Sequence, residues 1–507
     1  MTKLGKKKCS KGKLQISDFI VTHLGTNGVT GTCLILEIPK ENLKIMLDCG
    51  FYQDSTLTAK QQFDINAKKF KDLDLSTVTH VLVSHAHLDH CGALGMLMTP
   101  ESGFNGKIMC TEASQPLIML NVKDSAFVMQ QTCKMYNKAN PSKKPLEPLY
   151  LECHANDLIL SLQGYRYDEE IPLTQNVSIR FKPCGHLLGD SSIVIEYKKD
   201  EYTTRRLLFT GDTNAYCESP RPFTKQWDCE ELEIDALIME NTYSGRFHEK
   251  RDTYKELENH VINHVVKNRG VLFIPVFAIG RSSQVTYYLK QIWDNNPEFR
   301  KANIPVYLAG AMLNQAHNVY ANDYYRKHYM DECWGESDCF KWGNVKKISK
   351  FCEVEEQLVD NKPKIILASS GMVQGGGYSV YLSQQLLGRH NVMTLFCGYQ
   401  SAQTGGKAIL EAVESGKNVV TLQGKKYTIR CQVPKPLSMS GHGDERQLIK
   451  LVKSCHQGKL KHIILVHGDE EGKAHMKERL KQELDMDKKM VHIPQIGESI
   501  RMFNNNK

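Results

Sequence analysis

The sequence feature that most constrains this chain is the run His-Ala-His-Leu-Asp-His at residues 85–90. It directly follows the apolar segment 78–83, whose β-branched residues favour a buried strand. Residues 91–97 favour the start of a helix, so Asp89 would lie at a helix N-terminus, where a negative charge suits the helix dipole. His85 and His87 would share one side of the turn, because side chains two apart in an extended segment point the same way.

A strand-to-helix turn of this kind can direct several side chains at one point. Neutral imidazoles with a carboxylate are ligands that suit zinc, and two zinc ions need about this many donors. The alternative is an N-capped helix followed by polar loop histidines. The density of the pattern H-x-H-x-D-H, and its position behind a strand, favour the metal site.

Length and composition restrict the class of protein. The chain has 507 residues, enough for two or three domains, and a net charge of +8, which permits a polyanionic partner. No apolar run reaches the ~18–20 residues of a membrane span, and no secretory signal follows the basic N-terminus. The 16 cysteines are scattered without a C-x-x-C pair. We therefore expect a cytoplasmic protein with reduced thiols and no membrane partner. The lysine cluster within residues 3–13 is either a solvated terminus or a contact for a phosphate backbone.

The order of apolar segments predicts an α/β fold. Strands are expected within residues 19–50 and 178–210, and a polar helical excursion over the rim of the site within residues 130–170. The second half of the chain alternates strands with helices, among them helices over residues 252–268 and 311–330. That alternation is typical of a parallel α/β domain.

The H-x-H-x-D-H run resembles the second motif of the metallo-β-lactamase fold, and three other segments resemble its remaining motifs in the right order. Asp48, at the end of an apolar segment, resembles the aspartate of the first motif, which orients the metal-binding loop. His186 in Gly-His-Leu-Leu-Gly resembles the histidine ligand of the third motif, and Asp212 in Thr-Gly-Asp the bridging aspartate of the fourth. The fold implied is a four-layer αββα sandwich.

Three later residues resemble the motifs that distinguish the β-CASP family within this superfamily. They are Glu240, His442 in Ser-Gly-His, and His467 in Val-His-Gly-Asp. Residues 275–281 and 368–376 are also similar to β-CASP sequence. A histidine at the last motif resembles the RNA-processing members: the endonuclease subunits of the cleavage-and-polyadenylation and Integrator complexes, and their bacterial and archaeal counterparts.

This resemblance implies a metallo-β-lactamase domain formed by residues 1–244 and 435–507, with a parallel α/β β-CASP domain inserted over residues 245–434. Departures from the family pattern lie in the inserted domain. They bear on how substrate is bound more than on the chemistry of the predicted metal site. They are Ser282-Ser283-Gln284, Ala309-Gly310 and Gly405-Gly406-Lys407.

The resemblance further implies a site for two zinc ions, which generates hydroxide at neutral pH and holds both oxygens of an in-line displacement at phosphorus. One ion would be held by His85, His87 and His186, the other by Asp89, His90 and His467, with Asp212 bridging them. Asp48 would hydrogen-bond the ligand histidines and fix their tautomers.

Catalysis is assigned to Asp89, His442 and Glu240. His442 is the candidate general acid, kept protonated by Glu240, since a carboxylate raises the pKa of an imidazole. The pairing of these two residues comes from the resemblance, and the alternative for His442 is a turn histidine beside two glycines.

Substrate contacts are harder to assign from sequence. Ser440 and Gly441 could offer a hydroxyl and a backbone N–H to a phosphate, and Arg281 could contact the RNA. Tyr243 and Tyr399 would stack on bases only if they face the cleft. Trp334 is expected to be a packing or rim element.

We expect a zinc-dependent ribonuclease that uses metal-activated hydroxide and leaves 5′-phosphate and 3′-hydroxyl ends, in RNA processing or decay. An endonuclease is favoured because the chain ends soon after the last motif, without the extra domain of RNase J exonucleases. The alternatives are a 5′-exoribonuclease of the RNase J kind, a small-molecule hydrolase such as a thioesterase or lactonase, and a non-catalytic RNA-binding subunit. Expected partners are single-stranded RNA and either a second copy of the chain or the subunits of a processing complex.

Overall fold

The computed structural model describes residues 17–504 except 215, 217–231, 332–337, 359, 457 and 485–486. The lysine cluster within residues 3–13 and Trp334 lie outside the described residues. Among the helices that are described, none is both long enough and apolar enough to cross a membrane.

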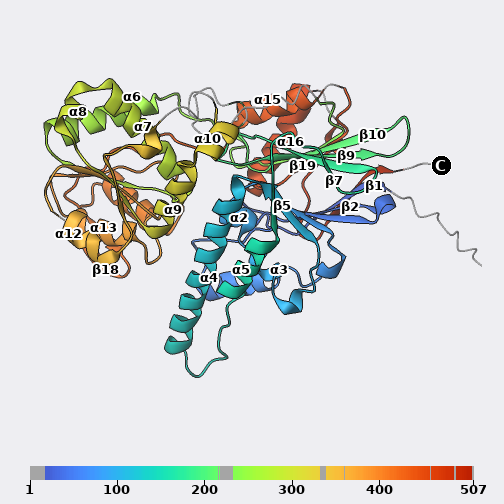
Figure 1. The fold of residues 1–507 in the computed structure, drawn as a ribbon, viewed down its shortest axis with the longest axis horizontal. Coiled ribbons are helices and arrows are strands. Elements are labelled where there is room, and N and C mark those ends of the chain that lie inside the picture. Colours follow the sequence, from blue (N-terminus) through green and yellow to red (C-terminus); the bar gives the residue numbers. More distant parts are fainter. Residues whose placement is uncertain are drawn as a thin grey trace, which may run out of the picture.

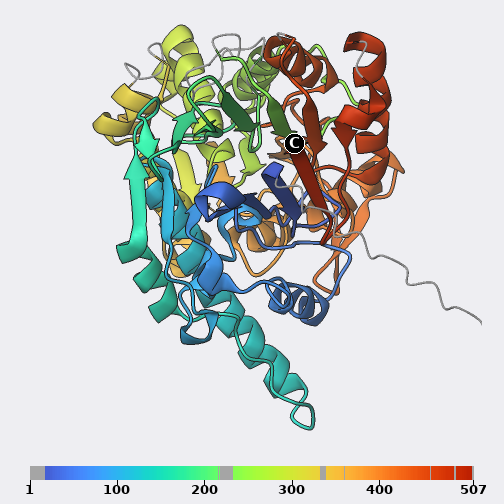
Figure 2. The same ribbon diagram turned by 90° about the vertical axis from the view of Figure 1, so that its right-hand side faces the viewer.

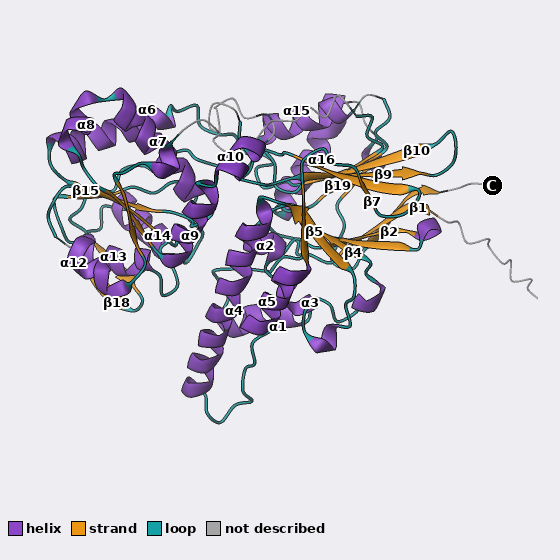
Figure 3. Ribbon diagram, viewed as in Figure 1, coloured by secondary structure: helices purple, strands orange, loops and turns teal. Residues whose placement is uncertain are grey.

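Two seven-stranded sheets face each other in the larger half of the molecule (Figure 3). The first has the order β21-β1-β2-β3-β4-β5-β6, and its strands are β1 (Ser17–His23), β2 (Leu34–Ile38), β3 (Leu43–Leu47), β4 (His80–Leu82), β5 (Lys107–Thr111), β6 (Leu162–Tyr165) and β21 (Ser499–Asn504). Pairing is parallel from β3 to β6 and antiparallel on the other side of β3.

The second sheet has the order β20-β19-β11-β10-β9-β8-β7. Its strands are β7 (Ile171–Pro172), β8 (Val177–Lys182), β9 (Ser192–Lys198), β10 (Thr204–Phe209), β11 (Ala236–Met239), β19 (His462–Leu465) and β20 (Val491–His492). Strands β10, β11, β19 and β20 run parallel, so their carboxyl ends meet at one edge. Side chains such as Phe19, Phe181 and Ile464 pack between the two sheets in one buried cluster.

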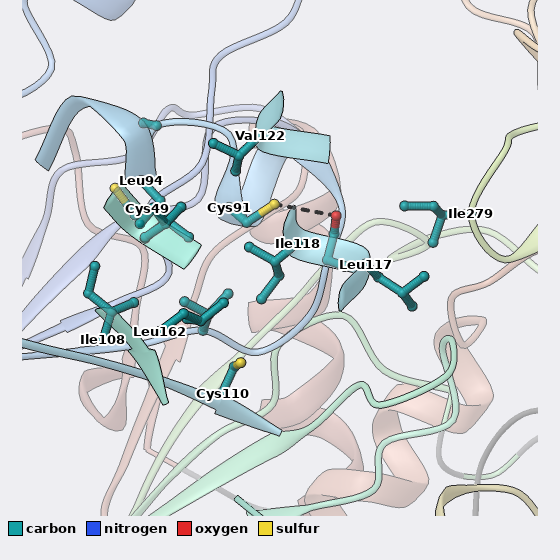
Figure 4. Packing of buried hydrophobic residues seen from close by; sticks show 14 of the residues in the cluster. Cys49, Cys91, Leu94, Ile108, Cys110, Leu117, Ile118, Val122, Leu162 and Ile279 are labelled. Atoms are coloured by element: carbon teal, nitrogen blue, oxygen red, sulfur yellow. Dashed lines mark hydrogen bonds between the residues drawn. The ribbon is translucent and has the colours of Figure 1, made fainter. Parts of the chain in front are cut away.

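Helices cover both outer faces, which completes the αββα order of layers and confirms that prediction. On the first sheet lie α1 (Ala59–Ala67), α2 (Leu88–Cys91), α3 (Leu94–Leu97), α4 (Ser114–Ala139) and α5 (Glu152–Ser161); on the second lie α15 (Glu445–Cys455) and α16 (Glu470–Leu484). Figure 4 shows Leu117, Ile118 and Val122 of α4 in the cluster that also holds Ile108 of β5. Leu448 of α15 packs in the same way on the second sheet.

The other half of the molecule is built on a five-stranded parallel sheet of order β14-β13-β15-β12-β16, at the left of Figure 1. Its strands are β12 (Val271–Pro275), β13 (Val306–Ala309), β14 (Val345–Ile348), β15 (Lys364–Ala368) and β16 (Val392–Thr394), with a hairpin of β17 (Val419–Leu422) and β18 (Lys425–Thr428). Its helices are α6 (Thr253–His260), α7 (Arg281–Asn295), α8 (Pro297–Ala302), α9 (Ala311–Tyr320), α10 (Asp323–Tyr329), α12 (Phe351–Leu358), α13 (Tyr378–Leu386) and α14 (Gly405–Glu414). This confirms the predicted inserted parallel domain; its limits at residues 245 and 434 stay a prediction.

Three helices differ from expectation. The helix behind the metal loop is divided into the short α2 and α3. The helix expected over 311–330 is divided into α9 and α10, because Asn322 caps the second with its side chain. Residues 253–267 form α6 followed by the π-helix η5 (Val261–Lys267). Short 3-10 turns complete the chain: η1 (Pro39–Glu41), η2 (Leu75–Thr77), η3 (Pro100–Ser102), η6 (Cys339–Lys341) and η7 (Lys488–Met490).

The helical excursion differs in direction. Helix α4 extends to Ala139, and its far end projects away from the body of the molecule, as the two views agree (Figures 1 and 2). Only the first half of α4 approaches the metal loop, where Asn121 donates to the carbonyl of Ala86. The far end therefore does not cover the rim of the site.

Candidate metal centre

The predicted ligands converge because their loops leave strands at common edges. Asp212 and Glu240 follow the parallel neighbours β10 and β11, and His467 follows β19, in which Ile464 lies opposite Ile238. The loop after β4 brings the four residues of the H-x-H-x-D-H motif from the facing sheet, and His186 arrives from the loop before β9.

Two groups of potential ligand atoms result, and within each group the atoms lie within 4.8 Å of one another. The groups are His85, His87, His186 and Asp212, and Asp89, His90, Asp212 and His467. In the first, His87 Nδ1 lies 3.1 Å from His85 Nε2 and 3.0 Å from His186 Nε2. In the second, His467 Nε2 lies 3.3 Å from Asp89 Oδ2. Asp212 belongs to both groups, so it stands where a bridging ligand would be needed.

The donor set fits zinc. His85, His90 and Asp212 are almost fully buried, and within the described residues neither His90 Nε2 nor Asp212 Oδ1 has a hydrogen-bond partner, although these atoms are 3.2 Å apart. Buried polar atoms without partners are costly, and a cation would satisfy them. Burial lowers the pKa of His85 well below its usual value and that of His87 to about 4, which favours the neutral form that binds a metal, whereas the carboxylates of Asp212 and Asp48 raise the pKa of His90.

The nitrogens that point away from the cluster are held by hydrogen bonds. His90 Nδ1 lies 2.6 Å from Asp48 Oδ2, and Asp48 also accepts from the backbone N–H and the hydroxyl of Ser84, both at 2.7 Å. His186 Nδ1 donates to the carbonyl of Gly441 at 2.7 Å, whereas His467 Nδ1 lies 3.0 Å from the Thr242 hydroxyl and 3.3 Å from Asp212 Oδ1 within the cluster. Such contacts fix which nitrogen faces the metal.

Glu240 and His442 meet beside the cluster. His442 Nδ1 lies 3.0 Å from both carboxylate oxygens of Glu240, while its Nε2 is 3.9 Å from Asp212 Oδ2. Burial alone would lower the pKa of His442, but the carboxylates of Glu240 and Asp212 raise it to about 9. Contact with these carboxylates favours the protonated form of His442. These two residues also form a third group of potential ligands with Asp212 and His467.

The candidate substrate contacts are placed differently. Ser440 accepts from the backbone N–H of His442 at 3.1 Å, so its hydroxyl shapes the turn. Gly441 contributes its carbonyl to His186. Arg281 begins α7, where its guanidinium donates to Gln284 at 3.1 Å. Tyr243 packs on the His442 ring, with centroids 6.3 Å apart and planes at 30°.

Several supporting residues carried no separate signal in the sequence. The Ser84 hydroxyl donates to Asp48, the Thr242 hydroxyl contacts His467, and His248 lies 2.8 Å from the carbonyl of His442. Asp190 accepts from the backbone N–H groups of His186 and Leu187 and shapes the third ligand loop. An aspartate four residues after a loop histidine is compatible with such a turn, and this spacing was the one available signal.

The two facing sheets, with ligand loops gathered at one end, define a metallo-β-lactamase fold. Three segments match known families: residues 26–102 the metallo-beta-lactamase superfamily, residues 283–409 the Beta-Casp domain, and residues 426–494 the Zn-dependent metallo-hydrolase RNA specificity domain. A solved structure titled as a protein of unknown function from Enterococcus faecalis V583 superposes with a TM-score of 0.54 at 14% identity, covering 96% of this chain and 99% of that one. That likeness shows the fold alone.

Sequence similarity to known proteins extends over nearly the whole chain. An RNase J-like protein of Methanocaldococcus jannaschii is 28% identical over 454 residues, covering 88% of this chain and 91% of its own. Cleavage and polyadenylation specificity factor 73 of Drosophila melanogaster is 26% identical, covering 92% and 62%, and Integrator complex subunit 11 of Gallus gallus is 23% identical, covering 96% and 74%. The chain belongs to the β-CASP family of the metallo-β-lactamase superfamily, in the branch that carries an RNA specificity domain.

Proposed function

We propose that this protein is a zinc-dependent ribonuclease that hydrolyses phosphodiester bonds of single-stranded RNA. The observation that carries the proposal is the Glu240–His442 pair, with His442 Nδ1 3.0 Å from the Glu240 carboxylate, beside a cluster of potential metal ligands in a chain that matches an RNA specificity domain. A small-molecule hydrolase needs no second domain of this size beside its site.

Two zinc ions are proposed, held by the two ligand groups that share Asp212. Bound zinc would supply a nucleophile at neutral pH and polarise the phosphoryl oxygens. Asp89 is assigned to catalysis as a ligand in the open second group, where it is more exposed than His90. Asp48 orients His90, and the Gly441 carbonyl orients His186.

The residues of the chain supply the proton for the departing oxygen. When the bond between phosphorus and O3′ breaks, the proton on His442 Nε2 moves to O3′ and leaves a 3′-hydroxyl, while the other fragment keeps a 5′-phosphate. Glu240 holds Nδ1, so the ring presents Nε2 toward the cluster. The backbone N–H of Thr213 donates to Glu240 at 2.7 Å and fixes that carboxylate.

An endonuclease is the proposed mode, since the similar chains include cleavage and polyadenylation specificity factor 73 and Integrator complex subunit 11. The RNase J-like protein favours the second candidate, a 5′-exoribonuclease. The names of the first two relatives also suggest that the chain works with other subunits. Ser440, Gly441 and Arg281 stay proposed contacts for the RNA.

One experiment tests the proposal. Linear and circular single-stranded RNA, internally labelled, would be incubated with the purified protein, with zinc and with chelator. We expect zinc-dependent cutting of the circle that is lost in Asp89→Ala and kept in the exposed matched control Asp200→Ala. Cutting of linear RNA alone would establish an exonuclease. No cutting of either RNA by a zinc-loaded protein would contradict a self-sufficient ribonuclease.

A further inference from the structure

Two aromatic side chains are exposed on the inserted domain where it adjoins the metal centre. Tyr399 is 71% exposed and Phe277 is 43% exposed. Burying a large apolar side chain lowers the free energy of the protein. Two such side chains left exposed on one edge of a sheet therefore mark a candidate binding surface.

The topology explains why they share a location. Phe277 follows β12 and Tyr399 follows β16, and these neighbouring strands run parallel, so both residues leave the sheet at its carboxyl edge. The loop after β15 adjoins both segments: a Cβ placed on Gly371 would be 3.1 Å from the Phe277 ring. Gln400 Nε2 donates to the carbonyls of Gly371 at 3.2 Å and of Tyr399 at 3.1 Å. The backbone is thus fixed while the rings stay in solvent.

The segment that carries Tyr399 also touches both halves of the molecule. A Cβ placed on Gly398 would lie 3.2 Å from the carbonyl oxygen of Met439, two residues before Gly441, whose own carbonyl orients His186. From the other side, the Ser55 hydroxyl, in the loop after β3, donates to the carbonyl of Ala402 at 2.5 Å. Tyr399 therefore stands at the junction of the two halves, next to the segment that leads to His442.

A positive charge lies near the same edge. Arg281 opens α7 four residues after Phe277, and the backbone N–H of the next residue, Ser282, donates to the carbonyl of Phe277 at 3.2 Å. Aromatic faces combined with basic groups are the composition of surfaces that bind single-stranded nucleic acid.

We propose that Tyr399 and Phe277 form a base-stacking platform that holds nucleotides of single-stranded RNA beside the scissile bond. The inference rests on the proposed ribonuclease function and names the residues that would hold the single strand. Because every base has an aromatic face, the platform favours unpaired RNA over duplex and discriminates little between sequences. A protein partner that covers these rings is the competing occupant.

The test measures binding apart from cleavage. Single-stranded RNA of about 12 nucleotides with 2-aminopurine at successive positions, the length of a typical single-strand site, would be titrated with protein in chelator. Wild-type protein is expected to quench the fluorescence at one or two adjacent positions. Tyr399→Ala should lose that quenching and bind about 5- to 100-fold more weakly, whereas Tyr399→Phe, which keeps the ring, should stay within about twofold of wild type.

Tyr202→Ala is the matched control, since Tyr202 is 90% exposed and lies in the turn between β9 and β10 of the second seven-stranded sheet, outside the inserted domain. Phe277→Leu supplies a second variant that keeps the contact with Gly371 while removing the ring. Unchanged binding and quenching in Tyr399→Ala would overturn the platform, as would a change in self-association without a change in RNA binding. Cleavage assays on the same preparations separate the two proposals, because wild-type protein that binds RNA without cutting it would refute the nuclease and leave the platform standing.

Discussion

The metal centre and the aromatic edge of the inserted domain adjoin one another but are built in opposite ways. At the centre, His85, His90 and Asp212 are buried, and contacts with Ser84 and Asp48 hold the two imidazoles. At the edge, Tyr399 is exposed, and a Cβ on Gly376 would meet nothing within 4 Å. Groups that hold a cation must be ordered before it arrives, whereas groups that meet a flexible polymer can remain open and be ordered on binding.

The largest effect is expected at the ligand shared by the two groups. Asp212→Ala should reduce bound zinc and bring RNA cleavage down to background, because both proposed metal positions lose a carboxylate oxygen. Metal analysis and cleavage rates would be compared with Asp200→Ala. Full zinc content in Asp212→Ala would show that the cluster does not depend on a bridging carboxylate.

A substitution of His442, the proposed general acid, should change the cleavage rate without changing metal binding. His442→Ala is expected to lower the cleavage rate by about 10²–10⁴-fold, the usual contribution of a positioned general acid, with zinc content unchanged. A rate equal to wild type would remove His442 from the mechanism while leaving the metal assignment intact.

Removing support behind a ligand should cost less than removing the ligand. Asp48→Asn keeps the volume of the side chain but loses the charge that faces His90 Nδ1, and about 10- to 100-fold weaker zinc binding is expected. Competition with a chromogenic chelator measures this. If zinc affinity matched wild type, orientation by Asp48 would be unnecessary.

The fall of the cleavage rate at high pH should depend on the Glu240–His442 pair. Since the pKa of His442 is raised to about 9, the donor form is present below that pH, and the rate should fall as the pH rises through it. Glu240→Gln removes the neighbouring charge, so this limb should move to lower pH by about 1–3 units. Profiles of kcat/KM against pH provide the check, and coincident limbs would contradict the coupling.

The smallest effect is expected at the open edge. Gly376→Ala should change the free energy of unfolding by no more than about 0.5 kcal/mol, as for other surface positions. Gly50→Ala is the contrast, because its Cβ would lie 1.6 Å from the carbonyl oxygen of Asp89 and must displace the metal loop. Chemical denaturation of both variants would show whether the two regions differ in tolerance as the structure implies.

Sequence was informative where chemistry is written in consecutive residues. The alternation of strands and helices predicted the inserted parallel sheet, while the resemblance of the H-x-H-x-D-H run and the later motifs implied the sandwich and the family. The roles of Ser84, Thr242 and His248 could not be predicted from the sequence. Each contacts the site through a single side chain, and that contact exists only because strands distant in the sequence pair with each other. The division between α9 and α10 could not be predicted for a different reason, because it depends on one capping side chain, that of Asn322. The site roles drawn from the family motifs, now placed together in space, stay predictions until the variants are measured.

The pairing of β19 with β11 has a consequence for the order in which the protein can fold during synthesis. The chain leaves the second sheet after Met239 and returns to the neighbouring position only at His462. A nascent chain that has already produced six of the seven proposed ligands still lacks His467, and the acid His442 comes late as well. Domains form in order as a chain emerges during synthesis. The strands of the inserted sheet are therefore all made before β19, and β11 gains this neighbour, with His467 behind it, only when the last part of the chain has emerged.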